Sequence, residues 1–454
     1  PDLAMTVIGF LDDDAALHGR TLNGVPVLGP TSSLKRIVAE LDVQEIIVAM
    51  PSAPREKVRA LLNAAAEDGV QTRVMPQLVV ARGSVSLRDL RTVEVEDLLG
   101  REPTPIDVEQ VRETVIGRVV AVTGAAGSIG AELCRQLAGL GPERLVLIDV
   151  DESRLYELWL ELEGRAKGLA TMELCDIRSS AQIDAVFSRH APAVVLHSAA
   201  YKHVPLMELA PAEAIKTNVG GTRAVLEACE RHAVERFVLI STDKAVAPAN
   251  VMGLSKALAE GVMLDVARRG AVTVMAVRFG NVLGSRGSVV PIFEEQLRHG
   301  GPLTVTGPDV TRYFMTIPEA ARLVMQAQAI GEAGDVFVLE MGEPVRIVDL
   351  ARKMIALSGV PVDVEFIGLR PGEKMHEDLV ADHETLLPTG RANILRVDRV
   401  GLPGKGTAGE IAKLVDAAEA GDLNRMWESI ARLEPGYPQP EAWARTPTPP
   451  PSSA

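Results

Sequence analysis

Short apolar runs alternate with longer amphipathic segments along most of the chain. In the central part the apolar runs lie at residues 119–123, 144–149, 172–175, 193–197, 237–241 and 272–279. The segments between them carry apolar residues at helical spacing, as residues 129–140 do. Apolar runs separated by amphipathic helices are typical of parallel strands joined by crossover helices. The pattern predicts an α/β fold with a Rossmann-like, doubly wound parallel sheet.

The flanking regions divide the chain into three predicted parts. Residues 1–105 show the same alternation on a smaller scale and predict a truncated Rossmann-like domain, with a first strand at residues 6–11. Residues 106–433 hold the main sheet at about 115–280, followed by shorter elements at about 281–400 that we interpret as a small C-terminal lobe. Residues 434–454 are rich in Pro, Ser and Thr, and we expect this tail to be disordered.

The composition narrows the classes of function. The chain has 454 residues and a formal net charge of −14 at pH 7, so it lacks the basic character that a nucleic-acid partner needs. Its three cysteines form no C-x-x-C pair, and their odd number argues against a disulfide framework. We also expect no bound metal. No apolar run is long enough to span a bilayer, and the chain begins with Pro1, so we expect a soluble fragment of a longer protein.

A glycine-rich segment joins the run at 119–123 to the helix that follows it. Its G-x-x-G-x-x-G spacing places Gly124 at a tight turn, Gly127 where the backbone approaches a pyrophosphate, and Gly130 where helix and strand pack closely. Asp149 ends the next strand, where an acidic side chain accepts the ribose hydroxyls of NAD and repels the 2′-phosphate of NADP. We therefore predict bound NAD, with a ligand-free turn between strand and helix as the alternative.

Further predicted cofactor contacts lie in the same loop and at the ends of the neighbouring strands. Asp176 ends the third strand, where a carboxylate can contact an adenine amino group; an ordinary turn is the alternative. Small residues after the fourth strand leave room for the central ribose and the pyrophosphate. The predicted set also includes Ala126, Ser128, Ile129, Ile177, Ala199, Ala200 and Tyr201.

Six motifs follow one another along the chain: TGAAGSIG, AAYKHVPLME, TNVGGT, STDKAVAPANVMGLSK, RFGNVLGSRGSVVP and GLRPGEKMHEDL. Together they resemble the extended short-chain dehydrogenases/reductases. Within that group they resemble the membrane-associated UDP-N-acetylglucosamine 4,6-dehydratases of the bacterial polysaccharide biosynthesis protein family. The resemblance covers about residues 3–397. One branch of these dehydratases carries Met in place of an active-site Tyr. This chain has Met252 at that position and so resembles that branch.

The resemblance implies a dehydration without net oxidation. NAD takes a hydride from sugar C4, the 4-keto group acidifies C5, water leaves across C5–C6, and the hydride returns to C6. The implied substrate is UDP-N-acetylglucosamine, with retention at C5. The resemblance also implies a homo-oligomer at the cytoplasmic face of the bacterial inner membrane, attached through a segment absent from this chain. The N-terminal domain is then a spacer or oligomerisation domain that binds no ligand.

The resemblance assigns the acid–base chemistry to the segment after the run at 237–241. Asp243 would protonate the departing 6-hydroxyl, Lys244 would remove the C5 proton, and Thr242 would hydrogen-bond the 4-oxygen. Lys244 can act as a base only if burial or a neighbouring cation lowers its pKa. Met252 and Lys256 stand where a Tyr-x-x-x-Lys pair is usual. Lys256 would bind the nicotinamide ribose, whereas Met252 cannot carry a proton. The acceptor of the 4-hydroxyl proton stays open between Asp243 and a water held by Thr242.

Other site residues come from the same resemblance. Asn218 lies at an expected helix start and would support the cofactor, act as an N-cap, or do both. Arg370, with Glu373 in the same turn, would close over the nucleotide, because arginine can bind a phosphate through two hydrogen bonds. The remaining predicted substrate contacts are Lys202, Asn281, Arg286, Ser288, Val289 and Arg312. Two alternative functions stay open: a UDP-sugar C4-epimerase, and a catalytically inactive scaffold that binds NAD or a UDP-sugar.

Overall fold

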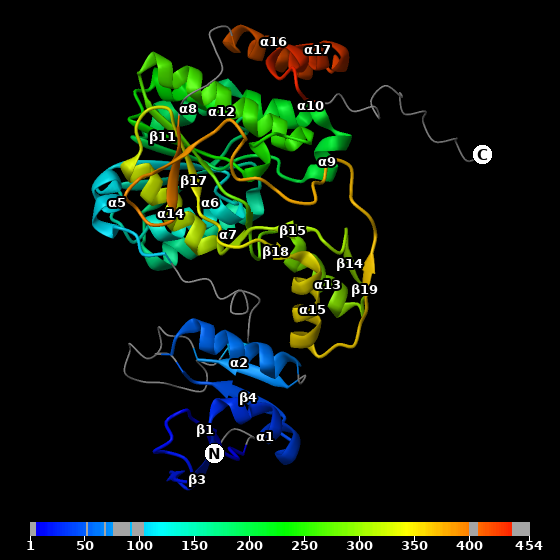
Figure 1. Ribbon diagram of the computed structural model, residues 1–454. Helices are drawn as coiled ribbons and strands as arrows, with labels where there is room; N and C mark the ends of the chain where they lie inside the picture. The colour runs from blue at the N-terminus through cyan, green and yellow to red at the C-terminus, as the bar shows by residue number, and fades with distance from the viewer. Residues whose placement is uncertain are drawn as a thin grey trace, which may run out of the picture. The chain divides into compact units, whose positions relative to one another are not determined.

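The computed structural model describes residues 6–50, 53–67, 70–75, 91–92, 104–398 and 407–437 (Figure 1). The chain forms two compact units, which are described one at a time. The first comprises Pro1–Pro103, Leu283–Val310 and Val345–Gly368, and the second comprises Thr104–Val282, Thr311–Pro344 and Leu369–Ala454. The predicted disordered tail lies outside the described residues from 438 onward.

The second unit is built on a nine-stranded sheet in the order β20-β21-β17-β12-β11-β10-β7-β8-β9. The strands from β17 to β9 pair in parallel, and β21 and β20 add antiparallel pairs at one edge. Strand β7 lies between β8 and β10, so the chain adds strands on both sides of β7, which confirms the predicted doubly wound fold. The strands are β7 (Val119–Thr123), β8 (Arg144–Asp149), β9 (Ala170–Leu174), β10 (Val194–His197), β11 (Arg236–Ile240), β12 (Thr273–Arg278), β17 (Asp335–Leu339), β20 (Leu386–Pro388) and β21 (Ile394–Val397).

Helices cover both faces of this sheet (Figure 1). Within β7, Val120 and Val122 belong to one hydrophobic core and Ala121 to the other, because successive strand residues point to opposite faces. The first core is completed by α5 (Val108–Val115), α6 (Ser128–Leu137), α7 (Glu152–Arg165) and α14 (Ile317–Ile330). The second is completed by α8 (Ser180–His190), α11 (Thr222–Arg231), α12 (Val251–Arg269), α16 (Thr407–Glu419) and α17 (Leu423–Leu433).

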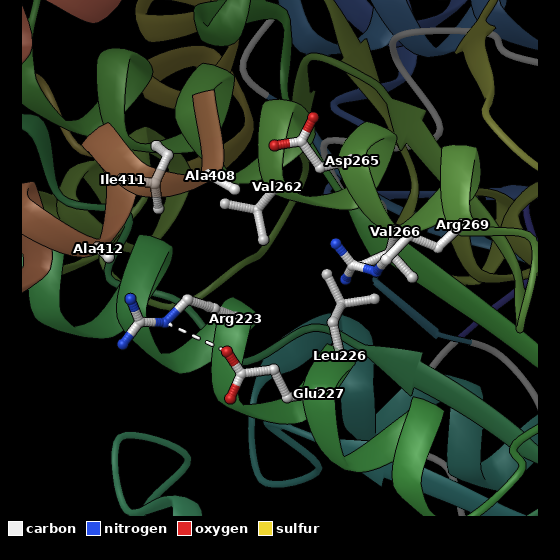
Figure 2. Close-up of a pocket in the computed structure, with 10 residues that line it drawn as sticks. All are labelled: Arg223, Leu226, Glu227, Val262, Asp265, Val266, Arg269, Ala408, Ile411 and Ala412. Atoms are coloured by element: carbon white, nitrogen blue, oxygen red, sulfur yellow. Dashed lines mark ion pairs between the residues drawn. The ribbon is translucent and has the colours of Figure 1, made fainter. Parts of the chain in front are cut away.

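A cavity of about 150 Å³ lies among α11, α12 and α16 (Figure 2). Its walls combine apolar side chains such as Val262 and Ile411 with charged ones, and Arg223 pairs with Glu227 there at 3.6 Å. None of the residues that line it belongs to the predicted site. The cavity is therefore a feature of the helical layer, separate from the carboxyl edge of the sheet.

The first unit contains smaller sheets. Strand β3 pairs in parallel with β1 and antiparallel with β2, and β4 pairs in parallel with β5. The expected strand at 6–11 is shorter than predicted, because its first residues, including Val7 and Ile8, are exposed and unpaired in a sheet. The described elements of the first unit are β1 (Phe10–Leu11), β2 (Thr21–Leu22), β3 (Val25–Gly29), η1 (Thr31–Ser33), α1 (Leu34–Leu41), β4 (Glu45–Val48), α2 (Arg55–Glu67), β5 (Gln71–Val74), β6 (Arg91–Thr92), α13 (Val289–Arg298), β14 (Leu303–Val305), β18 (Val345–Arg346), α15 (Ile347–Ser358) and β19 (Val364–Phe366).

Three further observations bear on function. Cys134, Cys175 and Cys229 are buried and form no disulfide. Within the described ranges, His, Cys, Asp and Glu side chains do not gather in groups of three or more that could hold a metal ion. The helices in the same part of the chain are all too short or too polar to cross a membrane.

Candidate active site

The turn after β7 is formed by glycines that leave no room for a side chain. Gly124 has a φ of +66°, and a Cβ there would lie 2.6 Å from the Ala199 backbone nitrogen. A Cβ on Gly130 would lie 2.8 Å from the Gly124 carbonyl carbon. The turn therefore packs directly against the segment after β10 and places the amino end of α6 beside it, as a pyrophosphate site requires. Some predicted contacts keep part of their surface exposed. At the turn these are Gly124, Gly127, Ser128 and Ile129, and after β10 they are Ala199, Ala200 and Tyr201.

Asp149 ends β8 beside the same turn. Its Oδ2 accepts a hydrogen bond from the Ala126 N–H at 2.9 Å, and its Oδ1 accepts from the N–H groups of Val150 and Asp151. These bonds fix the carboxylate next to the glycine turn, where a ribose acceptor is expected. The nearby Arg154 pairs with Asp151 at 3.3 Å. The residues present therefore fit the adenosine and pyrophosphate parts of a nicotinamide dinucleotide.

Asp176 and Ile177 follow β9 and contact different partners. Both Asp176 oxygens accept hydrogen bonds from Arg178 at 2.6–3.0 Å, and this pairing lowers the pKa of Asp176. Ile177 is buried, and a Cβ on Gly221 would lie 2.6 Å from its Cδ1. An adenine contact at Asp176 would have to share the carboxylate with Arg178, so this predicted contact stays a prediction.

Asn218 lies inside a helix and not at its start. The π-helical η3 (Ile215–Gly221) joins α10 (Pro211–Ala214) to α11, so the expected N-cap is wrong because the backbone before Asn218 is already helical. The Asn218 amide accepts from the Tyr201 N–H at 2.8 Å and donates to the Tyr201 carbonyl at 2.9 Å and to Ser255 Oγ at 2.8 Å. It therefore ties the segment after β10 to α12.

Met252 and Lys256 lie one turn apart on α12, and both are buried. Burial lowers the pKa of Lys256 to about 8, although the Glu260 carboxylate opposes this shift. His197, at the end of β10, lies between two threonine hydroxyls; burial and the charge of Lys256 lower its pKa to about 3. Lys256 thus lies near a neutral imidazole, and Met252 contributes apolar packing to the core beneath it.

The predicted acid–base segment forms a short 3₁₀ turn, η4 (Asp243–Ala245), directly after β11. Asp243 has no exposed surface, and its Oδ1 accepts from Thr242 Oγ1 at 2.8 Å and from Lys244 Nζ at 3.0 Å. The Lys244 amine also donates to the side-chain oxygen of Asn281 at 3.1 Å. The Lys244 side chain is 15% exposed, so it is largely buried, which is one of the two conditions expected of a base. The other condition, a neighbouring cation, is not met by these contacts, because Asp243 and Asn281 both present oxygens. A carboxyl group and an amine are thus in direct contact at the carboxyl edge of the sheet.

Glu377 is a further member of this cluster, and the sequence analysis does not name it. Its side chain is 3% exposed, and its Oε1 lies 3.6 Å from Lys244 Nζ. Burial raises the pKa of Glu377, and the charge of Lys244 opposes that rise. Among the described residues, Glu377 Oε2 and Asp243 Oδ2 are buried without a hydrogen-bond partner. Glu377 lies within the GLRPGEKMHEDL motif, and this motif is the sequence signal that could have identified it.

An ion pair shapes the turn that contains Arg370. The buried Arg312 donates to Glu373 Oε1 at 2.9 Å and to the Met375 carbonyl at 3.1 Å. Glu373 Oε2 in turn accepts from the Arg370 backbone N–H at 3.2 Å. Arg312 and Glu373 therefore hold the turn together, whereas the Arg370 side chain is exposed. Substrate contacts from these three residues stay a prediction.

The remaining predicted substrate residues lie in different parts of the chain. Lys202 is exposed and follows β10, and Asn281 belongs to the acid–base cluster. Arg286, Ser288 and Val289 belong to the first unit, where Ser288 is the N-cap residue of α13 and Val289 begins that helix. Their contact with a substrate stays a prediction.

Comparison with known proteins identifies the family of this chain. A family model described as Polysaccharide biosynthesis protein matches residues 120–399, and one described as CoA-binding domain matches residues 1–76. The probable polysaccharide biosynthesis protein EpsC of Bacillus subtilis (strain 168) is 44% identical over 383 residues, which cover 83% of this chain and 64% of EpsC. The chain thus spans just under two thirds of the length of that relative.

Two other similarities are to a curated relative and to a solved structure. A UDP-glucose 4-epimerase of Rickettsia canadensis (strain McKiel) is 36% identical over 277 residues, which cover 59% of this chain and 79% of the epimerase. The solved structure of DesIV, a dTDP-glucose 4,6-dehydratase from Streptomyces venezuelae with NAD and TYD bound, is 20% identical and has a TM-score of 0.52. The match covers 70% of this chain and 99% of DesIV, and it shows a shared fold. Because the first family model matches more than half of the chain, we conclude that the chain belongs to the polysaccharide biosynthesis protein family.

Proposed function

We propose that this chain catalyses the NAD-dependent dehydration of UDP-N-acetylglucosamine to UDP-2-acetamido-2,6-dideoxy-4-hexulose in bacterial polysaccharide or glycan synthesis. The observation that carries the proposal is the buried Asp243 carboxyl group in contact with the Lys244 amine, 3.0 Å apart. An acid and a base side by side suit an elimination, in which one proton is removed and another is delivered. The membership of the family supports a nucleotide sugar as the substrate.

The glycine turn and Asp149 would hold the pyrophosphate and the adenosine ribose of NAD, and Lys256 would bind the nicotinamide ribose. Bound NAD would supply the hydride acceptor for sugar C4 and the hydride donor for C6. We propose NAD over NADP, because the Asp149 carboxylate repels a 2′-phosphate. The pairing of Arg154 with Asp151 supports this choice, since it reduces the positive charge available to that phosphate.

The acid–base cluster would divide the proton transfers. Thr242 would hydrogen-bond the 4-oxygen, and Lys244 would take the C5 proton while the C–H electron pair forms the C5–C6 double bond. As the C6–O bond breaks, Asp243 would give its proton to the departing hydroxyl, which leaves as water. During C4 oxidation Asp243 would take up the proton of the 4-hydroxyl, directly or through a water held by Thr242, and this is the proton that it later gives to the departing 6-hydroxyl, so the cycle balances. Return of a proton from Lys244 to the same face of C5 would give retention.

A UDP-sugar C4-epimerase is the second candidate, and the 36% identity to the Rickettsia epimerase favours it. Both reactions must take the proton from the 4-hydroxyl. An epimerase on this fold would use the Tyr that Met252 replaces, whereas the dehydratase has Asp243 or a water held by Thr242 for that step. Epimerisation at C4 removes no water across C5–C6, so an epimerase would not need an adjacent acid and base such as Asp243 and Lys244. A catalytically inactive scaffold is the third candidate, and Met252 is the residue that favours it.

Mass spectrometry of the sugar nucleotide distinguishes these functions. The purified chain is incubated with NAD and UDP-N-acetylglucosamine, and a dehydratase gives a product lighter by one water with a 4-keto group. An epimerase leaves the mass unchanged and makes the C4 hydroxyl axial, and a scaffold leaves the substrate intact. Asp243→Asn removes the acid, so we expect it to lower the dehydration rate by roughly 10²-fold or more.

We also propose an organisation for the full-length protein. It would act as a homo-oligomer at the cytoplasmic face of the bacterial inner membrane. Residues 1–105 would form a spacer or oligomerisation domain, and residues 106–433 the dehydratase domain. The separate family match of residues 1–76 supports an N-terminal domain distinct from the dehydratase. Sedimentation of this chain with and without residues 1–105 tests the oligomerisation role.

A further inference from the structure

Several specific contacts place Glu377 beside the acid–base cluster. The Thr311 N–H and the Arg312 guanidinium both donate to the Met375 carbonyl, each at 3.1 Å. Earlier in the same segment, Asn250 donates to the Gly372 carbonyl at 3.0 Å, and a Cβ on Gly372 would lie 2.7 Å from Asn250 Cβ. Residues 372–375 are therefore held by Asn250 and by the segment at 311–312. These contacts fix the position of Glu377, which follows two residues later.

The hydrogen bonding of Glu377 differs from that of structural carboxylates in the same unit. Glu260 and Glu384 each use both of their oxygens to accept from Arg278, at 2.7–3.1 Å. Glu377 has a contact of 3.6 Å to Lys244 through Oε1, and its Oε2 has no partner among the described residues. A buried carboxyl oxygen without a partner is costly, so a purely structural role does not account for Glu377.

The charged groups that face Glu377 are Lys244, Asp243, Arg312 and Lys374. Arg312 already donates to Glu373, and Lys374 pairs with the exposed Asp378 at 3.6 Å. Lys244 contacts both Glu377 Oε1, at 3.6 Å, and Asp243 Oδ1, at 3.0 Å, and it gains a positive charge in the proposed elimination. When its amine takes the C5 proton, the new positive charge arises next to Glu377.

We propose that Glu377 is a positioning residue for the elimination step, whose carboxylate orients the Lys244 amine and stabilises the charge that this amine gains. The inference rests on the proposed dehydration and adds a third ionisable group to it. In this step the C5–H bond breaks and an N–H bond forms on Lys244, with Glu377 unchanged before and after. Because Lys244 takes no part in hydride removal from C4, Glu377 should affect the elimination and not the oxidation of C4.

Rapid-quench mass spectrometry with Glu377→Gln separates the two steps. The 4-keto sugar that still carries its 6-hydroxyl should form at the wild-type rate and then accumulate, because its loss of water slows by roughly 10²-fold. Glu377→Asp keeps the negative charge, so its rate of water loss should lie between those of the wild type and Glu377→Gln. The matched control is Asp382→Asn, which removes a carboxylate from an exposed residue shortly after Glu377; it should behave as wild type.

The pH dependence adds a readout that a structural role would not alter. Burial raises the pKa of Glu377, so in the wild type the elimination rate should rise with pH as this group ionises, over a range above that of a free glutamate. In Glu377→Gln that rise should be absent. If circular dichroism shows that Glu377→Gln is unfolded, Glu377→Asp and the wild-type profile provide the test.

Three results would overturn the inference. One is a Glu377→Gln variant that eliminates water at the wild-type rate. Another is equal slowing of C4 oxidation and elimination, which would indicate a general structural or binding role. The third is a wild-type chain that binds NAD and the UDP-sugar but releases no water, and this result would overturn the proposed function as well. The first two leave the dehydratase intact, so the two failures are distinguishable.

Discussion

The contact between Gly253 and Lys244 allows the site to be perturbed without changing an ionisable group. Gly253 is the third residue of α12, and a Cβ there would lie 3.0 Å from the Lys244 carbonyl carbon and closer still to its oxygen. Helix α12 therefore packs on η4 at a distance that only a glycine permits. In Gly253→Ala, the Lys244 backbone and α12 must move apart.

The size of the effect follows from this distance. Ordinary van der Waals contact of a Cβ begins at 3.4 Å, and the Lys244 carbonyl oxygen lies inside that limit by roughly 1 Å, so the carbonyl has to move by about that distance. A shift of that size in a catalytic group costs roughly 10²-fold in rate. Overpacking costs about 1–3 kcal/mol of stability, and the better helix propensity of alanine offsets about 0.5–1 kcal/mol of this. We expect kcat to fall roughly 10²-fold while the protein stays folded.

Gly261→Ala is the matched control, because Gly261 lies in the same helix and a Cβ there would meet no atom within 4 Å. This variant should keep the wild-type kcat and gain about 0.5–1 kcal/mol in the free energy of unfolding. The assays are initial rates of 4-keto product formation and urea denaturation. A Gly253→Ala variant with wild-type kcat would refute the reasoning, and so would a Gly261→Ala variant that is equally impaired.

Three other perturbations test separate parts of the account. Gly130→Ala should lower the affinity for NAD at least tenfold by calorimetry, since its Cβ would push the Gly124 carbonyl out of the turn, whereas Gly139→Ala, with its nearest atom at 3.5 Å, should not. The rate of C4 oxidation should fall about tenfold per pH unit above pH 8, where Lys256 loses its proton, and a flat profile to pH 9.5 would contradict this. His197 stays neutral in the fold to about pH 3 but takes up a proton near pH 6.5 when unfolded. Stability should therefore fall by about 2 kcal/mol between pH 7 and pH 5 in urea titrations, and His197→Gln should flatten that slope.

The parts of the fold that are encoded locally were predictable from the sequence. A strand, a G-x-x-G-x-x-G turn and a helix form one contiguous segment, and Asp149 comes at the end of the very next strand. The topology of a doubly wound sheet then brings the end of β11 to the same edge, so the proximity of the Asp243 turn to this edge also follows. The antiparallel β20 and β21 were not predicted, because they are short, and β20 ends in a proline that is atypical of strands.

The contacts that depend on distant segments were not predictable in the same way. Glu377 is supplied by a loop far along the chain, and no periodicity indicates which side chain of that loop turns inward. The resemblance implies a substrate contact for Arg312, which stays a prediction; its pairing with Glu373, which a buried guanidinium needs, could not be read from the sequence. The TNVGGT motif is expected at a helix start, where Asn218 could be an N-cap, but a π-helix begins at Ile215 and continues through Asn218.

Proton NMR of the product formed in heavy water tests the central claim most directly. The account predicts a 4-keto sugar with a C6 methyl group, deuterium at C5 from exchange at the Lys244 amine, and the original configuration at C5. A product with an intact 6-hydroxyl and an inverted C4, or an unchanged substrate in the presence of bound NAD, would contradict it.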